Sequence, residues 1–151
     1  MMKNIVLDSW SIIAWLQGES PGEKVRNLIN WVNGERDLED KIRSLIGQST
    51  IVEMRLLVNI INLGEVFYIL GRRKGEQEAK ETIDEIKENR LKIVPVSNSL
   101  VFKAASIKMN HLIAYADGFA IATAMTQEGS LLTGDPELKD ARDIPIIWIG
   151  E

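Results

Sequence analysis

Four acidic residues of this sequence stand where predicted strands end or where the next helix begins. Asp8 ends the apolar run "KNIVLD", and Asp135 follows "SLLTG" near the C-terminal end. Glu65 comes a few residues after the run "RLLVNIIN", and Asp117 opens the helical segment "ADGFAIATAM". The carboxyl ends of parallel strands share one edge of a sheet, and open α/β folds bind ligands there. We therefore expect the four side chains to lie close together.

These carboxylates predict a divalent-metal site. Four neighbouring carboxylates repel one another, so some would stay protonated unless a cation lay between them. Their hard oxygen atoms suit Mg²⁺ or Mn²⁺, and Mg²⁺ in proteins also shares the phosphate oxygens of a substrate. Such ions polarise a phosphodiester and lower the pKa of an attacking water. The chain has no cysteine and a single histidine, His111, so catalysis by a thiolate or a histidine pair is excluded.

The segments that must position these acids alternate between short apolar runs and helical patterns. The runs predict strands at residues 3–8, 55–62, 91–97, 130–134 and 144–150. Helical spacing of apolar residues predicts helices at residues 9–16, 21–34, 38–47, 63–75, 76–90, 99–110 and 115–129. Pro95 indicates an edge strand or the end of a strand. This alternation predicts an α/β fold with a mostly parallel five-stranded sheet, covered by helices on both faces.

The composition restricts the class of protein. A chain of 151 residues fits one domain and can bury a core without disulfides. No segment approaches the roughly 20 apolar residues of a membrane span, and the N-terminus reaches Asp8 before a signal-peptide core could form. The net charge of −4 argues against a generally basic nucleic-acid-binding surface but permits a local basic patch. We expect a soluble, cytoplasmic protein without a membrane segment.

Four stretches together resemble the PIN-domain ribonucleases, in particular the VapC-type toxins of toxin–antitoxin pairs. They are "IVLDSWSIIAWL", "NIINLGEVFYILGRRKG", "YADGFAIATAMTQEGSLLTGDPEL" and "IPIIWI". No single motif is highly specific, but their order and spacing extend over nearly the whole chain. The resemblance implies one PIN-like domain over residues 1–151, with a three-layer αβα fold.

The resemblance also implies roles for individual residues. It assigns Asp8, Glu65, Asp117 and Asp135 to the family's acidic metal-binding quartet, which holds Mg²⁺ or Mn²⁺ for catalysis. Thr133 and Ser9 match the family's hydroxyl residues, which orient the acids. The chain departs from the family at Trp10, where many relatives carry a small polar residue, and in a longer, more charged connection at residues 35–53.

Each acid also has an ordinary structural interpretation. Asp8 and Asp117 could cap the helices that follow them, and Asp135 could serve the turn before Pro136. Glu65 could complete a capping box with Asn62 as the N-cap. Glu137 and Asp140 are interpreted as solvated surface residues rather than outer ligands.

Three functions remain open from the sequence. The first is a metal-dependent endoribonuclease that acts as a toxin, forms a homodimer and is silenced by a small VapB-like antitoxin. The second is a catalytically weak or inactive PIN-fold module that binds RNA or protein. The third is a metal-dependent DNA nuclease of a related fold. The basic cluster Arg72, Arg73 and Lys74 is a candidate contact for RNA or for an acidic antitoxin segment, although cations also stabilise a helix C-terminus.

Overall fold

The computed structural model describes residues 2–47 and 53–151, and its centre is a parallel β-sheet. Five strands pair in the order β3-β2-β1-β4-β5, and all neighbouring strands are parallel. The strands are β1 (Met2–Leu7), β2 (Glu53–Asn59), β3 (Leu91–Val94), β4 (Ser130–Thr133) and β5 (Ile146–Trp148). The predicted α/β class and five-stranded sheet are therefore confirmed. Pro95 directly follows β3, which is an edge strand as predicted.

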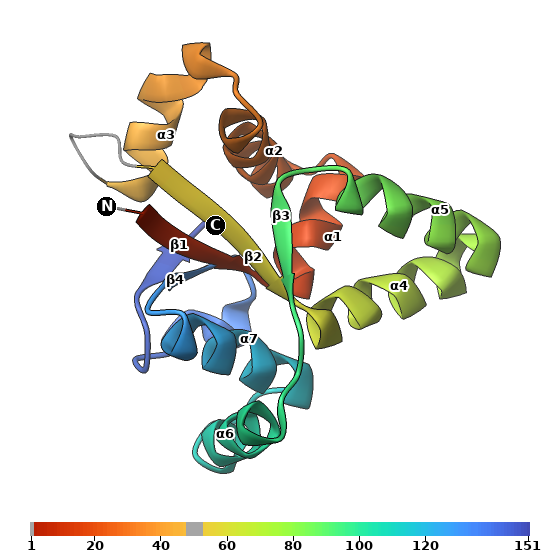
Figure 1. The fold of residues 1–151 in the computed structure, drawn as a ribbon, viewed down its shortest axis with the longest axis vertical. Helices are drawn as coiled ribbons and strands as arrows, with labels where there is room; N and C mark the ends of the chain where they lie inside the picture. The colour runs from red at the N-terminus through yellow and green to blue at the C-terminus, as the bar shows by residue number, and fades with distance from the viewer. Residues whose placement is uncertain (1, 48–52) are drawn as a thin grey trace.

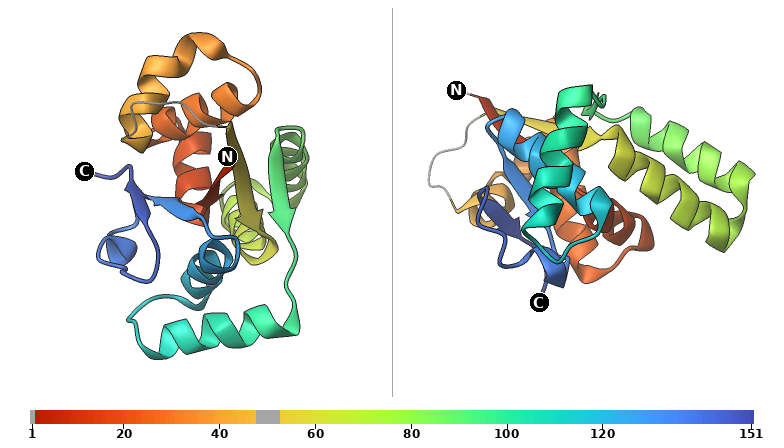
Figure 2. Two further views of the ribbon diagram at one scale, coloured as in Figure 1. Left: turned by 60° about the vertical axis from the view of Figure 1, so that its left-hand side comes forward. Right: turned by 90° about the horizontal axis from the view of Figure 1, so that it is seen from below.

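The helices lie in two layers that cover the two faces of the sheet (Figures 1 and 2). On one face lie α1 (Ser9–Gln17), α2 (Ser20–Val32), α3 (Glu39–Ile46), α4 (Ile60–Lys74) and α5 (Glu76–Lys87). On the other face lie α6 (Asn98–Met109) and α7 (Tyr115–Thr126). Two 3₁₀ turns, η1 (Arg36–Leu38) and η2 (Pro136–Leu138), complete the described elements. The predicted short helix at residues 38–47 is confirmed as α3.

Strand residues alternate between two hydrophobic cores. In β1, Ile5 and Leu7 pack against the layer of α1 to α5, whereas Val6 packs against α6 and α7. All three are fully buried, because helices cover both faces of this central strand. This explains why the strand segments read as continuous apolar runs.

The strand order reverses at β1. The chain first extends the sheet from β1 to β2 and β3, and then returns to the other side of β1 with β4 and β5. Such a reversal leaves a crevice at the carboxyl ends of the strands, because successive connections leave in opposite directions. Asp8 follows β1 and Asp135 follows β4, so both lie at this crevice.

The predicted boundary between β2 and α4 is wrong by three residues. Residues 60–62 were predicted to belong to the strand, but α4 already begins at Ile60. The reason is that Asn59 acts as the N-cap: its side-chain oxygen accepts a hydrogen bond from the backbone N–H of Ile61 at 2.8 Å. The predicted capping box with Asn62 as N-cap is therefore also wrong, and Glu65 lies in the second turn of α4 rather than its first.

Among the described residues, no helix is both long enough and apolar enough to cross a bilayer.

Candidate metal centre

Asp8 caps α1 and is fully enclosed at the end of β1. One carboxylate oxygen, Oδ1, accepts a hydrogen bond from the backbone N–H of Ser11 at 2.8 Å. The other, Oδ2, accepts from the hydroxyl of Thr133 at 2.5 Å. The Asp8 carboxylate thus caps α1 through one oxygen and is held by Thr133 through the other. Ser11, which the sequence did not single out, also donates its hydroxyl to the carbonyl of Leu132 and so ties α1 to β4.

Glu65 is brought to the same edge by α4. Ser9, the first residue of α1, donates its hydroxyl to Glu65 Oε1, which connects the end of β1 to α4. Asn62, one turn earlier on α4, donates its side-chain amide to the carbonyl of Ala116 at 3.0 Å. These contacts fix α4 between α1 and the N-terminal end of α7. The hydroxyl residue predicted to assist an acid, Ser9, therefore contacts Glu65 and not Asp8.

Asp117 stands at the N-terminus of a helix that is buried along most of its length. Its Oδ2 accepts a hydrogen bond from the backbone N–H of Ala114 at 3.2 Å. The next residue, Gly118, lets α7 approach α6 closely, since a Cβ there would stand 2.8 Å from the carbonyl oxygen of Ala104. Helix packing therefore sets the position of this carboxylate.

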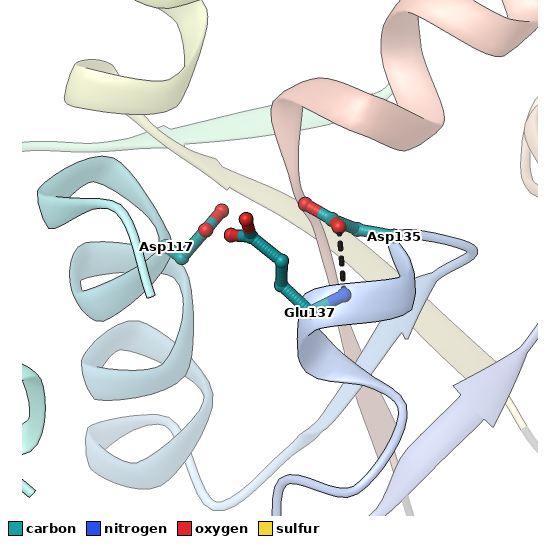
Figure 3. A group of neighbouring side chains, drawn as sticks. All are labelled: Asp117, Asp135 and Glu137. Atoms are coloured by element: carbon teal, nitrogen blue, oxygen red, sulfur yellow. Dashed lines mark hydrogen bonds between the residues drawn. The ribbon is translucent and has the colours of Figure 1, made fainter. Parts of the chain in front are cut away.

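Asp135 and Glu137 reach toward Asp117 from the turn after β4 (Figure 3). One carboxylate oxygen from each of the three residues lies within 4.8 Å of the others. Asp135 Oδ1 accepts the backbone N–H of Glu137 at 3.0 Å, and its own N–H donates to Thr133 Oγ1 at 3.1 Å. Glu137 was interpreted as a surface residue, and it is exposed, but its carboxylate joins the acidic group. The one signal for this in the sequence was Pro136, which starts a 3₁₀ turn that brings residue 137 back toward Asp135.

Burial and neighbouring negative charges raise the pKa values of Asp8 and Asp117. Burial raises the pKa of Asp8 from 3.8 to about 6, and the charge of Asp135 adds to the rise although hydrogen bonds from Thr133 and Ser11 oppose it. Burial also raises the pKa of Asp117, to about 7, and the charges of Asp135, Asp8 and Glu65 raise it further. In the described part of the chain, none of the four predicted acids forms an ion pair with a basic side chain. No direct ion pair with a described basic side chain therefore offsets the repulsion among these four acids.

A cavity of about 340 Å³ lies at this edge of the sheet. Its lining includes Ser9, Glu65, Asp117, Asp135 and Glu137. Asp8 lies beneath this surface, where only 1% of the residue is exposed. A divalent cation with hard-ligand preference would meet here the oxygen donors that it prefers, so the residues fit Mg²⁺ or Mn²⁺.

Trp10 packs against the turn that precedes Asp135. A Cβ on Gly134 would overlap the Trp10 ring, so the ring lies directly against the backbone of this turn. The departure from the family at position 10 therefore changes the packing of this turn, while Thr133 and Ser11 supply the hydrogen bonds to Asp8.

The three residues of the predicted basic cluster, Arg72, Arg73 and Lys74, have different surroundings. Arg73 lines the acidic cavity, whereas Arg72 lies over the ring of Tyr68 and Lys74 pairs with Glu78. His111 lies elsewhere, with its Nε2 2.9 Å from Asp143 Oδ2.

Comparison with known families is decisive for the fold. The PIN domain family matches residues 26–144, which is most of the chain. The chain belongs to the PIN domain family. Glu65, Asp117 and Asp135 lie inside the matched region, and Asp8 precedes it. No curated protein sequence was found to match the chain.

Solved structures of similar fold align with nearly the whole length of this PIN domain protein. DNA-bound VapBC from Salmonella typhimurium gives a TM-score of 0.66 at 13% identity, covering 99% of both chains. VapBC-1 from nontypeable Haemophilus influenzae gives 0.62 at 14% identity, covering 97% of this chain and 98% of that one. VapC20 from Mycobacterium tuberculosis, a toxin that cleaves the sarcin-ricin loop, gives 0.59 at 17% identity, covering 93% and 98%. At these identities the likeness shows that the fold is VapC-like.

Proposed function

We propose that this PIN domain protein is a divalent-metal-dependent ribonuclease that hydrolyses RNA phosphodiester bonds. The observation that carries the proposal is the convergence of Asp117, Asp135 and Glu137, with carboxylate oxygens within 4.8 Å of one another. Glu65 lines the same cavity, and Asp8 raises the pKa of Asp117 through its charge. Clustered carboxylates without ion-pair partners lower the stability of the fold. At a strand-order reversal they therefore indicate a binding site for a cation and a phosphate substrate rather than a structural role.

Asp8, Glu65, Asp117 and Asp135 are the proposed metal-binding residues, and Glu137 is added to them by its position. A bound Mg²⁺ or Mn²⁺ supplies electrophilic polarisation of the phosphodiester and of the attacking water. The protein's own part is to hold the carboxylates in place. Thr133 and Ser11 fix both oxygens of Asp8, Ser9 fixes Glu65, and the backbone of Ala114 fixes Asp117.

The raised pKa of Asp117 gives metal binding a dependence on pH. A carboxyl group with a pKa of about 7 still carries a proton in part of the molecules at neutral pH, and a cation must displace that proton. Metal affinity should therefore increase as the pH rises through 7.

We further propose that the protein acts as a cytoplasmic toxin with a small antitoxin partner and forms a homodimer. The structures of similar fold from Salmonella typhimurium and Haemophilus influenzae are described as VapBC, which supports such a partner. The surface of α6 and the turn after it also supports protein contacts. Phe102, Met109 and Leu112 are 75%, 82% and 100% exposed there, and large exposed apolar side chains often mark a protein interface.

Cleavage by the purified protein tests the proposal directly. We expect single-stranded or structured RNA to be cut in the presence of Mn²⁺ or Mg²⁺, DNA of the same sequence to survive, and EDTA to stop the reaction. Asp117→Asn should abolish cleavage, whereas the control Asp84→Asn, on the exposed side of α5, should not. Cleavage that is unchanged in Asp117→Asn would exclude this site, and preferred cleavage of DNA would identify a DNA nuclease.

Metal binding separates the ribonuclease from an inactive binding module. A cation that binds the folded protein at a true site raises its melting temperature according to RT ln(1 + [L]/Kd). We expect Mn²⁺ to raise the melting temperature of the wild type and not that of Asp117→Asn. RNA binding that persists in both proteins, without cleavage and without stabilisation by Mn²⁺, would instead indicate a module that only binds.

A further inference from the structure

The acidic cavity has one basic residue in its wall. Besides the carboxylates, its lining includes Ile69, Arg73, Gln17 and Glu19. Arg73 comes from the last turn of α4, and Gln17 and Glu19 come from the end of α1 and the residues after it. A cation in the wall of an acidic cavity changes what the cavity can bind, since it offers an anion a contact away from the carboxylates.

Arg73 lies on the same face of α4 as Glu65. Glu65, Ile69 and Arg73 follow one another at intervals of four residues, and all three line the cavity. Eight residues of α-helix rise by about 12 Å, so the guanidinium group starts roughly that far along the helix from the carboxylate. One helix face therefore presents a metal-binding group at one end and an anion-binding group at the other.

Among the described residues, a neutral side chain, and not a carboxylate, contacts the guanidinium group of Arg73. When the Gln17 amide is turned so that both neighbours are satisfied, its oxygen accepts a hydrogen bond from Arg73 Nη1 and its nitrogen donates one to Glu19. Over residues 2–47 and 53–151, Arg73 makes no ion pair with a carboxylate. The neutral amide thus holds the guanidinium group at the cavity wall without engaging it in an ion pair.

The two basic neighbours of Arg73 differ from it. Arg72 lies with its guanidinium carbon 5.8 Å from the centre of the Tyr68 ring. Lys74 lies 3.9 Å from Glu78, one turn further on. Neither of them lines the cavity. The helix C-terminus alone would favour all three cations equally, so it does not explain why Arg73 alone of the three lines the acidic cavity.

We propose that Arg73 binds a phosphate of the RNA strand close to, but distinct from, the phosphate that is cleaved. The proposal rests on the proposed ribonuclease function and names one contact of its substrate. An RNA strand with one phosphate at the acidic group carries further phosphates on either side, and α4 supplies the basic residue of the cavity wall on the same helix face as Glu65. The guanidinium fork matches the oxygens of a phosphate in a bidentate arrangement that lysine cannot reproduce. Because the contact is to the backbone, it should be independent of the base sequence.

Steady-state cleavage of one RNA in Mn²⁺ tests the proposal with three variants. We expect Arg73→Gln to raise KM about tenfold and to change kcat less than threefold. Arg73→Lys should recover only part of the loss, and Arg72→Gln should leave KM within twofold of wild type. The slope of log K against log salt should become less negative by about 0.7 in Arg73→Gln, as expected for one lost phosphate contact to a single strand.

Binding without cleavage separates this proposal from the proposed function. The Asp117→Asn protein, with and without Arg73→Gln, is titrated with the same labelled RNA, and the second substitution should weaken binding even if no cleavage is ever seen. The Mn²⁺-induced rise of the melting temperature should be the same in Arg73→Gln and wild type, which shows an intact fold and metal site.

Three results would overturn the role of Arg73. The first is an unchanged KM and Kd for RNA in Arg73→Gln. The second is an equal loss in Arg72→Gln and Arg73→Gln, which would indicate a diffuse charge effect. The third is unchanged RNA binding together with loss of a protein that co-purifies with the wild type from its host, which would assign Arg73 to a protein partner.

Discussion

The hydroxyl of Thr133 donates a hydrogen bond to Asp8 Oδ2 at 2.5 Å, across 125 positions of the sequence. The bond joins the ends of the neighbouring strands β1 and β4. The same Thr133 oxygen accepts the backbone N–H of Asp135 at 3.1 Å. One threonine thus connects two of the proposed metal-binding acids and fixes their separation.

Replacing Thr133 by valine should weaken this connection while keeping the shape of the side chain. Asp8 would lose a donor to its buried carboxylate, and hydrogen bonds to charged groups contribute about 1.5–3 kcal/mol. We expect the free energy of unfolding at pH 8 to fall by roughly 1–2 kcal/mol and the Kd for Mn²⁺ to rise about tenfold. Thr82→Val is the control, because the Thr82 hydroxyl bonds only the carbonyl of Glu78 on the exposed helix α5. Equal effects of the two substitutions would contradict a special role for Thr133.

Removing the charge of Asp117 should stabilise the metal-free protein. Its carboxylate is buried, and three other acids raise its pKa, so the neutral amide of Asp117→Asn avoids that penalty. At pH 8 in EDTA we expect a gain on the order of 1 kcal/mol, equivalent to about 3 °C in melting temperature. The same variant should lose the stabilisation by Mn²⁺. A variant that melts below wild type in EDTA would show that Asp117 has a structural role stronger than its electrostatic cost.

The stability of the metal-free protein should decrease as the pH rises from 5 to 8. The folded pKa values of Asp8 and Asp117 are about 6 and 7, above the ordinary 3.8. In this range the folded protein retains protons that the unfolded chain has released, so the free energy of unfolding falls with pH until both groups are ionised. Urea unfolding at unit pH steps in EDTA measures the slope.

Asp117→Asn is the comparison protein for this pH series. Its free energy of unfolding should fall less steeply between pH 5 and 8, because it lacks the group with the higher pKa. Identical slopes in the two proteins would mean that Asp117 titrates normally. Saturating Mn²⁺ should stabilise the wild type more at pH 8 than at pH 5, since the cation competes with protons for the same carboxylates.

Glu137 should contribute to metal affinity although it is exposed. Its carboxylate lies within 4.8 Å of Asp117 and Asp135, whereas Asp140, three residues later, is not part of the group. We expect Glu137→Gln to raise the Kd for Mn²⁺ about tenfold, in the range found for groups that support a metal site, and Asp140→Asn to leave it unchanged. Isothermal titration of the three proteins measures this, and equal affinity of Glu137→Gln and wild type would remove Glu137 from the site.

Two helical glycines beside site acids should respond in opposite directions to alanine. In Gly118→Ala the new Cβ would meet the Ala104 carbonyl oxygen at 2.8 Å, which forces α7 away from α6. We expect a loss of about 1–2 kcal/mol, typical of overpacking, and weaker Mn²⁺ binding because Asp117 moves with α7. In Gly64→Ala nothing lies within 4 Å of the new Cβ, so the better helix propensity of alanine should stabilise by about 0.5–1 kcal/mol. Thermal melts that show both variants stabilised would mean that the α6–α7 contact adapts at little cost.

The sequence by itself determined the elements and the positions of the acids along them. Apolar runs defined the five strands, because helices cover both faces of the sheet and bury most residues of the central strands β1, β2 and β4. Asp8, Asp117 and Asp135 were predicted as site residues because they follow apolar strand runs or open a helix, where the carboxyl ends of parallel strands share one edge of the sheet. Local chemistry alone did not locate the start of α4, since Asn59 and Asn62 are both good N-caps and only the hydrogen bond from Ile61 distinguishes them.

The tertiary structure decided which side chains share the cavity. The partner of Ser9 is Glu65 rather than Asp8, because α1 and α4 pack side by side on one face of the sheet. Glu137 joins the acids, which residue type and spacing did not indicate. Arg73 alone of its cluster lines their cavity, and its spacing from Glu65 gained meaning only once the cavity was seen. The physical reason is that a carboxylate or guanidinium group on a surface turn or helix end gains a role only from its distance to groups far away in the chain. That distance is set by helix packing and by the reversal of strand order at β1.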